Sequence, residues 1–204
     1  MTMPISLVLF DMDDVLCRYD RSARVRKLAK LCARTFDEVV HAVWGSGLEA
    51  QADAGLLDET EYLSTTGKLL GCHISKDNWL DARRAAMSPN LDVLALASAV
   101  STQCRVAVLT NNPQIVTENI ACLCPAVAEL FGTDIYASAS FKASKPAAQT
   151  YLRCLEALNV AADEALFVDD LEVNVAGART AGLHGHLFTG REALSSVLRN
   201  HDLL

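Results

Sequence analysis

The chain alternates between short apolar runs and segments with helical spacing of apolar residues. Ile5–Phe10 is a continuous apolar run, similar runs lie at Arg105–Leu109, Ala165–Val168 and Leu183–Phe188, and a shorter candidate lies at Asp134–Tyr136. Such runs are typical of strands buried on both faces of a parallel sheet. Helical patterns separate them, over the ranges Leu91–Val100, Gln114–Cys122, Ala147–Leu158, Val173–Ala181 and Arg191–Arg199. The alternation predicts an α/β fold with a doubly wound, Rossmann-like parallel sheet.

Residues 18–87 interrupt this alternation, because no convincing strand pattern occurs there. Four or five helices are expected in this stretch, over the ranges Ser22–Arg34, Phe36–Val43, Leu48–Ala54, Glu59–Leu70 and Lys76–Met87. Several glycines fall near the expected helix ends, where glycine commonly terminates helices. Ser88-Pro89-Asn90 then marks a boundary. We therefore predict an α/β core built from residues 1–17 and 88–204, with a helical insertion at 18–87.

Composition and charge narrow the class of protein. The chain has 204 residues, 51% of them hydrophobic, and a formal net charge of −7. A domain of this size buries roughly 70% of the surface of its unfolded chain and needs no metal to fold. The acidic balance argues against nucleic-acid binding, which requires a basic surface. No run approaches the ~20 apolar residues of a membrane helix, and no signal peptide is recognisable. A cytoplasmic protein without a membrane partner is expected.

The cysteines indicate neither a disulfide framework nor a zinc site. Their number is odd, they are scattered, and no CxxC pair occurs. Reduced thiols are therefore expected at all seven positions, which are Cys17, Cys32, Cys72, Cys104, Cys122, Cys124 and Cys154.

An acidic turn follows the first predicted strand. Asp11, Asp13 and Asp14 lie within four residues, at the strand end where open α/β sheets bind ligands. Asp11 and Asp13 should point to the same side, because side chains alternate in extended backbone. Two carboxylates in one site acquire separated pKa values, which suits one of them as a nucleophile and the other as a general acid–base.

Polar residues also follow the next predicted strand. Thr110, Asn111 and Asn112 precede Pro113, which is expected to open a helix whose N-terminus suits a phosphate group. Lys145 stands before Pro146, which is expected in the first turn of another helix, and would place a positive charge beside that helix start.

A second acidic pair follows the strand at Ala165–Val168. Asp169 and Asp170 occupy its end, and Asn174 lies four residues beyond Asp170. Carboxylates from two strand ends can meet around Mg²⁺, which prefers oxygen ligands and often shares them with a substrate phosphate. The sequence therefore favours Mg²⁺ as the cofactor.

The order of these motifs resembles that of the haloacid dehalogenase superfamily, specifically its phosphatase-like branch with a small helical cap after the first motif. Residues 10–16 are similar to motif I, and residues 108–112 to motif II. Lys145-Pro146 is similar to motif III, while residues 167–170, with Asn174, are similar to motif IV. The resemblance covers essentially the whole chain.

The resemblance implies a role for each motif residue. Asp11 would attack phosphorus and form an aspartyl-phosphate, and Asp13 would protonate the leaving oxygen and then activate water. Mg²⁺ would be held by Asp11, the backbone carbonyl of Asp13 and Asp170, with Asp169 and Asn174 orienting waters; whether Asp169 or Asp170 is the direct ligand stays open. Phosphate oxygens and the site's negative charge would be met by Thr110, Asn111 and Lys145.

One motif residue departs from the family pattern. Asp14 stands where many relatives have glycine, so its backbone is either left-handed, which Asp tolerates better than most residues, or its side chain points into solvent.

Substrate selectivity is expected in the helical cap, which closes over the leaving group in this family. His41 and Trp44 are candidate substrate contacts, because their spacing of three places them on one helix face. A compact cap suits a small phosphorylated metabolite, and a sugar phosphate is one candidate.

The resulting prediction is a Mg²⁺-dependent phosphomonoesterase. A phosphomutase would use the same residues, and a non-catalytic phospho-receiver or binding protein is the alternative from another class. A signalling receiver domain is disfavoured, because here the acidic pairs flank the Thr and Lys motifs. A dehalogenase would have no comparable use for Asp13, Asp170 and Mg²⁺. The oligomeric state is not predicted.

Overall fold

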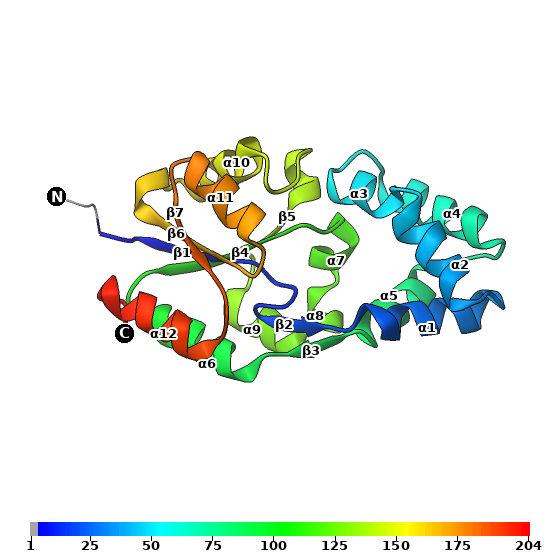
Figure 1. Ribbon diagram of the computed structural model, residues 1–204, viewed down its shortest axis with the longest axis horizontal. Helices are drawn as coiled ribbons and strands as arrows, with labels where there is room; N and C mark the ends of the chain where they lie inside the picture. The colour runs from blue at the N-terminus through cyan, green and yellow to red at the C-terminus, as the bar shows by residue number, and fades with distance from the viewer. Residues whose placement is uncertain (1–3) are drawn as a thin grey trace.

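The computed structural model describes residues 4–204, which form two lobes (Figure 1). Residues 1–3 of the predicted core segment lie outside the described residues. The larger lobe contains a five-stranded parallel sheet in the order β5-β4-β1-β6-β7. Its strands are β1 (Leu7–Phe10), β4 (Arg105–Thr110), β5 (Ile135–Ala137), β6 (Ala165–Asp169) and β7 (His184–Leu187). The predicted parallel α/β sheet is confirmed.

The central strand explains why the sheet needs helices on both faces. All four residues of β1 are buried. Val8 and Phe10 belong to the apolar cluster that includes residues of α6 (Leu91–Val100), α9 (Pro125–Phe131) and α12 (Arg191–Asn200). Leu7 and Leu9 belong to a second cluster, which is built with α10 (Ala148–Leu158) and α11 (Glu172–Thr180). The two sets of helices cover opposite faces of the sheet (Figure 1).

The prediction of one continuous helix over Gln114–Cys122 is wrong. The chain instead forms α7 (Gln114–Glu118) and α8 (Ile120–Leu123), followed directly by α9. Asn119 leaves helical geometry, and its side-chain amide donates to the carbonyl of Ile115 at 2.7 Å. Pro125 then begins α9, and the residue before a proline avoids helical geometry.

Two prolines lie just outside the helices that they were expected to open. Pro113 occupies the N-cap of α7, and Pro146 precedes α10, which starts at Ala148. The polar loop between β5 and α10 contains a 3₁₀ turn, η2 (Ser138–Phe141), and a second such turn, η3 (Ala162–Glu164), precedes β6.

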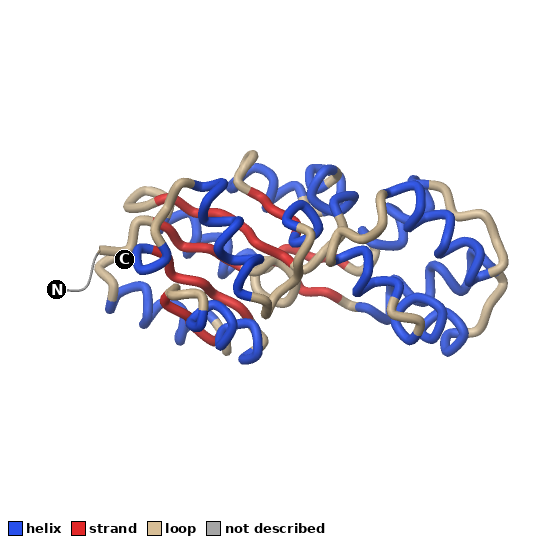
Figure 2. Tube along the Cα trace, turned by 90° about the horizontal axis from the view of Figure 1, so that it is seen from above, coloured by secondary structure: helices blue, strands red, loops and turns tan. Residues whose placement is uncertain are grey.

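The smaller lobe, called the cap below, consists of helices joined to the core by a two-stranded ribbon (Figure 2). The ribbon pairs β2 (Cys17–Tyr19) with β3 (Met87–Pro89), which are antiparallel and too short to be recognised in the sequence. Between them lie α1 (Arg21–Cys32), α2 (Phe36–Val40), the π-helix η1 (His41–Gly45), α3 (Leu48–Asp53), α4 (Glu59–Leu70) and α5 (Lys76–Arg84). Side chains cap several of these helices: Asp20 accepts from the Ser22 N–H, and Thr35 and Asp58 form capping boxes.

The expectation of seven reduced thiols is wrong for one pair. Cys32, at the end of α1, is disulfide-bonded to Cys72, just after α4. The two residues are 40 positions apart, and only the tertiary structure brings their backbones together. Disulfides are rare in cytosolic proteins. The Cys32–Cys72 bond therefore gives no support to the expected cytoplasmic location, which stays a prediction. None of the helices within residues 4–204 is both long and apolar enough to cross a membrane.

Candidate active site

The predicted chemical residues meet in one cavity between the sheet and the cap. It has a volume of about 450 Å³ and lies at the carboxyl ends of β1, β4 and β6. β1 lies between β4 and β6, so the chain order reverses at this point of the sheet, as in other ligand sites of open α/β folds. The predicted residues that line the cavity are Asp11, Asp13, Thr110, Asn111, Lys145, Asp170, Asn174 and Trp44.

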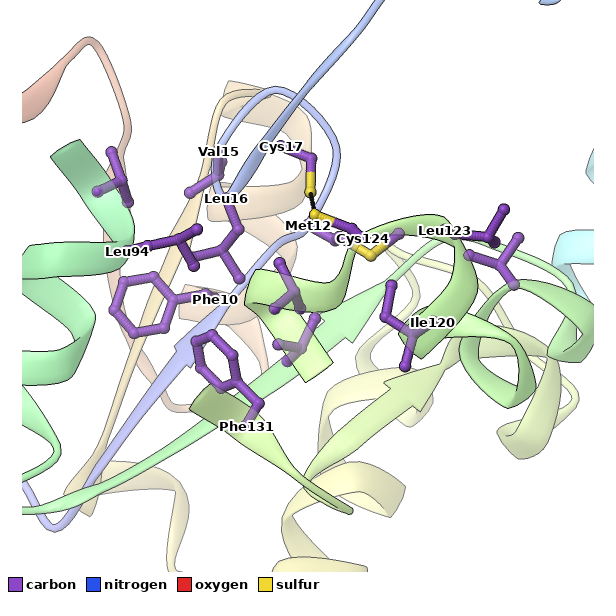
Figure 3. Packing of buried hydrophobic residues seen from close by; sticks show 14 of the residues in the cluster. Phe10, Met12, Val15, Leu16, Cys17, Leu94, Ile120, Leu123, Cys124 and Phe131 are labelled. Atoms are coloured by element: carbon purple, nitrogen blue, oxygen red, sulfur yellow. Dashed lines mark hydrogen bonds between the residues drawn. The ribbon is translucent and has the colours of Figure 1, made fainter. Parts of the chain in front are cut away.

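The loop after β1 presents its carboxylates to the cavity. Met12 and Leu16 are fully buried in the apolar cluster beneath the loop (Figure 3). Asp11 and Asp13 precede and follow Met12 and line the cavity, as the expected alternation of side chains requires. Beside this loop, the Cys17 thiol donates a hydrogen bond to Cys124 Sγ at 3.0 Å (Figure 3).

Asp14 adopts the left-handed backbone that glycine would favour. Its φ is 61°, and its Oδ1 accepts a hydrogen bond from the Tyr19 N–H at 3.0 Å. Asp tolerates this conformation because its short polar side chain can bond locally. The carboxylate of Asp14 thereby links the acidic turn to the end of β2, the first strand of the ribbon.

Lys145 links the two acidic pairs. Its Nζ lies 2.8 Å from Asp11 Oδ1 and 2.7 Å from Asp169 Oδ2, and its side chain is fully buried. Burial by itself lowers the pKa of Lys145, but the charges of Asp11 and Asp169 outweigh burial and raise that pKa above its ordinary value. Burial raises the pKa of Asp11 to about 7, against the opposing effect of the Lys145 ammonium.

Backbone contacts hold Lys145 in this position. Asn111 Nδ2 donates to the carbonyl of Lys145 at 2.9 Å, and the Lys145 N–H donates to Asn111 Oδ1 at 2.8 Å. A Cβ on Gly177 would clash with the carbonyl oxygen of Pro146, so only glycine lets α11 approach this loop so closely. The two hydrogen bonds between the Asn111 side chain and the Lys145 backbone thus position Lys145, a role that the sequence did not suggest.

The two residues of the second acidic pair, Asp169 and Asp170, differ in burial and in hydrogen bonding. Asp169 is fully buried, and its carboxylate accepts from Lys145, from the Leu171 N–H at 2.9 Å and from Asn174 Nδ2 at 3.1 Å. Asp170 is partly exposed and lines the cavity. Burial, together with the neighbouring charge of Asp169, raises the pKa of Asp170. Asp170 therefore has the more accessible carboxylate of the two.

A carboxylate cluster in the cavity fits a hard cation. Oxygens of Asp11, Asp169 and Asp170 lie within 4.8 Å of one another. An all-oxygen set with at least one solvent-accessible member suits Mg²⁺, which keeps part of its water shell. The residues present therefore fit the predicted cofactor.

The cap contributes buried charged residues that sequence analysis missed. Arg24 and Arg83 line the cavity although their exposed fractions are only 3% and 2%. Each arginine lies on the apolar face of a helix: Arg24 is four residues before the buried Leu28, and Arg83 is four residues after the buried Trp79. The sequence did offer a signal for both residues, because an arginine four positions from an apolar residue is expected on the same, buried face of its helix.

The expectation that His41 faces the leaving group is wrong. Trp44 lines the cavity, where its ring lies 5.1 Å from the Arg21 guanidinium. His41 is exposed and borders a different depression, next to Arg34 and Leu70. The two residues share one π-helical turn, closed by a Ser46 N–H to His41 carbonyl bond of 2.9 Å. This wider turn removes the shared face that α-helical spacing predicts.

Comparisons with known proteins agree with this geometry. The family model of haloacid dehalogenase-like hydrolases matches residues 5–182. A protein of Mycobacterium tuberculosis named as a phosphatase is 28% identical over 196 residues, covering 91% of this chain and 88% of the relative.

Solved structures share the fold. A haloacid dehalogenase family enzyme from Bacteroides thetaiotaomicron superposes with a TM-score of 0.82 at 21% identity, covering 97% of this chain and 100% of that one. The same enzyme has been solved with magnesium and inorganic phosphate, with a TM-score of 0.75 at 21% identity over 90% of this chain and 93% of that one. L-2-haloacid dehalogenase from Xanthobacter autotrophicus gives a TM-score of 0.64 at 20% identity, covering 96% of this chain and 82% of that one.

Proposed function

The chain belongs to the haloacid dehalogenase-like hydrolase family, and we propose that it is a magnesium-dependent phosphomonoesterase. Its substrate would be a small phosphorylated metabolite that fits a cavity of about 450 Å³. A sugar phosphate is a candidate, because the cap wall of the cavity offers the ring of Trp44 and charged side chains to a polar leaving group.

The observation that carries this proposal is the buried bridge of Lys145 between Asp11 and Asp169, beside the more accessible Asp170. A phosphate dianion is repelled by a cluster of carboxylates unless positive charge is supplied. Lys145 supplies one such charge, and a divalent cation at the carboxylate cluster would supply the rest.

The residues divide the reaction between two steps. Asp11 attacks phosphorus and forms an aspartyl-phosphate, while Asp13 donates a proton to the departing oxygen. In the second step Asp13 accepts a proton from water, which attacks phosphorus and releases inorganic phosphate. Thr110 and Lys145 bind oxygens of the transferring group, whose charge grows in the transition state.

The metal would be held by Asp11, by the backbone carbonyl of Asp13 and by Asp170. Asp169 is the less suitable direct ligand, because its oxygens already accept from Lys145, Leu171 and Asn174. When bound, Mg²⁺ offsets negative charge on the nucleophile and on the phosphate.

Relatives support phosphate ester hydrolysis over dehalogenation. The Mycobacterium relative is named as a phosphatase, and the Bacteroides enzyme binds magnesium and inorganic phosphate. The Xanthobacter dehalogenase shares the fold, but dehalogenation would leave Asp13 and Asp170 without a role. The metal cluster and the second carboxylate on the acidic turn favour the phosphatase.

A phosphate-release assay over a panel of phosphorylated metabolites tests the proposal. We expect release of inorganic phosphate from at least one small ester with Mg²⁺, loss of release with excess EDTA, and recovery when Mg²⁺ is restored. Chromatography of the products separates a phosphatase from a mutase, since a mutase yields an isomeric ester instead of free phosphate. Release that persists unchanged in EDTA would contradict the metal-dependent mechanism.

A further inference from the structure

One arginine of the cap reaches into the acidic turn of the core. Arg83 lies in the last turn of α5, and its Nη2 donates to Asp13 Oδ2 at 2.6 Å. The Arg83 guanidinium also stacks over the ring of Tyr19, with its Cζ 4.1 Å from the ring centroid. A buried side chain is thus held between the ribbon and the core, with its charge directed at a single carboxylate.

The hydrogen bonds of Asp13 distinguish its two oxygens. Oδ2 accepts from Arg83 and also from Asn112 Nδ2 at 3.1 Å, and Asn112 in turn donates to Thr110 Oγ1 at 2.8 Å. Oδ1 is buried and has no hydrogen-bond partner within residues 4–204. The two donors to Oδ2 therefore set the orientation of the Asp13 carboxyl group, whose side chain is 22% exposed and lines the cavity.

We propose that Arg83 is a positioning residue that holds the carboxyl group of Asp13 in the orientation for proton transfer to the leaving oxygen, and that it does so only when the cap is seated on the core. The inference rests on the proposed function, because it assumes that Asp13 transfers the proton. Arg83 belongs to the cap and Asp13 to the core, and their bond spans 70 residues of sequence. General acid–base catalysis therefore depends on the placement of the cap.

A purely structural ion pair would look different. The neighbouring Arg84 is such a case: its side chain is 58% exposed and bonds to Asp81 of the same helix at 3.3 Å. Arg83 instead shares Oδ2 with an amide that itself contacts the predicted phosphate-binding Thr110. Two donors from separate lobes fix one oxygen and thereby fix the direction of the other.

The leaving group provides the test, because only a poor leaving group needs a proton. p-Nitrophenolate departs without protonation, whereas the alkoxide of glycerol 2-phosphate requires it. We expect Arg83→Met to lower kcat/KM for glycerol 2-phosphate at least about tenfold more than for p-nitrophenyl phosphate, since general acid catalysis contributes roughly 10²–10⁴-fold. Arg83→Lys should recover part of this difference, and Arg84→Met, on the same helix, should leave the ratio of the two values unchanged.

A double-mutant cycle separates positioning from folding. In an Asp13→Asn background, Arg83→Met should cause little further loss for glycerol 2-phosphate, because its effect passes through Asp13. Equal losses on both substrates, or additive losses in the double variant, would overturn the inference. If Arg83→Met does not fold, Arg83→Lys is compared with wild type on both substrates in the same way.

Failure of the proposed function gives a distinct result. A wild-type protein that hydrolyses neither ester, nor any member of the metabolite panel, would overturn the phosphatase proposal and the role of Arg83 with it. A wild-type protein that hydrolyses both esters, with a ratio unaffected by Arg83→Met, would overturn only the role of Arg83.

Discussion

Two buried clusters face each other across the cavity, and they differ in charge balance: the core cluster has two carboxylates for one ammonium, whereas the cap cluster has one carboxylate for one guanidinium. In the core, Lys145 bridges Asp11 and Asp169, and burial raises the pKa of Asp11 to about 7. In the cap, Arg24 Nη1 lies 2.5 Å from Glu49 Oε1, and Arg24 Nη2 donates to the Tyr62 hydroxyl at 2.8 Å.

Tyr62 closes the cap cluster. Its hydroxyl donates to Glu49 Oε2 at 2.8 Å and accepts from Trp79 Nε1 at 3.2 Å. The ring of Trp79 in turn lies 4.9 Å from the Arg24 guanidinium. The charges of this cluster are thus paired within the cap.

The core cluster has the features of a reactive site, whereas the cap cluster has those of a structural ion pair. The core cluster keeps one nucleophilic carboxylate at a raised pKa, with an accessible acid beside it, as functional sites commonly do. The cap cluster balances the charge of Arg24 with that of Glu49, and a buried pair of this kind is costly chiefly when one partner is removed. We therefore expect substitutions in the first cluster to act on turnover and those in the second to act on folding.

The largest expected effect is on turnover, from Asp11→Asn. Without a nucleophilic carboxylate no aspartyl-phosphate can form, so hydrolysis of p-nitrophenyl phosphate should fall by at least ~10³-fold. The folded state should be retained, because Lys145 keeps its contact with Asp169. Steady-state kinetics and a thermal unfolding curve check the two halves. Residual turnover near the wild-type rate would remove Asp11 from the nucleophile's role.

The next effect concerns stability, from Arg24→Met. Glu49 and Tyr62 would lose their buried cation, and breaking a buried pair on one side costs about 3–5 kcal/mol of unfolding free energy. Lys27→Met is the matched control on α1, because Lys27 forms a surface pair with Asp81 and such pairs contribute about 0–1 kcal/mol. Urea unfolding measures both variants. A similar small loss for the two would show that the cap cluster is no more important than a surface pair.

The smallest effect is expected at Asp14, which borders the core cluster without belonging to it. Asp14→Gly relieves a left-handed residue but removes the bond to the Tyr19 N–H. These contributions oppose one another, so the unfolding free energy should stay within about 1 kcal/mol of wild type. Asp14→Val keeps the unfavourable φ and loses the bond, so it should cost about 2 kcal/mol or more. Equal stabilities of the two variants would contradict this account of the turn.

The core could be predicted well because its signals are local. Each chemical motif directly follows an apolar run, and the carboxyl ends of parallel strands meet at one edge of the sheet. That rule alone brings Asp11, Thr110 and Asp170 to one cavity. The broken helix after β4 was missed, because Asn119 terminates α7 through its own side chain and offers no stronger sequence signal than other polar residues.

The cap was predictable only as a set of helices. Its helix ends carry capping residues, but which faces meet depends on packing between segments far apart in sequence. Arg83 donates a hydrogen bond to Asp13, 70 positions away in sequence, and Cys32 forms a disulfide with Cys72, 40 positions away. His41 and Trp44 separate because one turn is π-helical, which depends on the surrounding packing as well as on the local sequence.

The sequence by itself determined the parallel α/β core, the helical insertion and the order of the motif residues, since these follow from hydrophobic period and from position relative to strand ends. Only the tertiary structure decided how those residues share the work. It engages Asp169 with Lys145 and leaves Asp170 accessible, turns Asn111 toward the backbone of Lys145, and brings Arg83 from the cap to Asp13. The physical reason is that hydrogen-bond partners and burial are set by distant segments packed together, which local patterns do not encode.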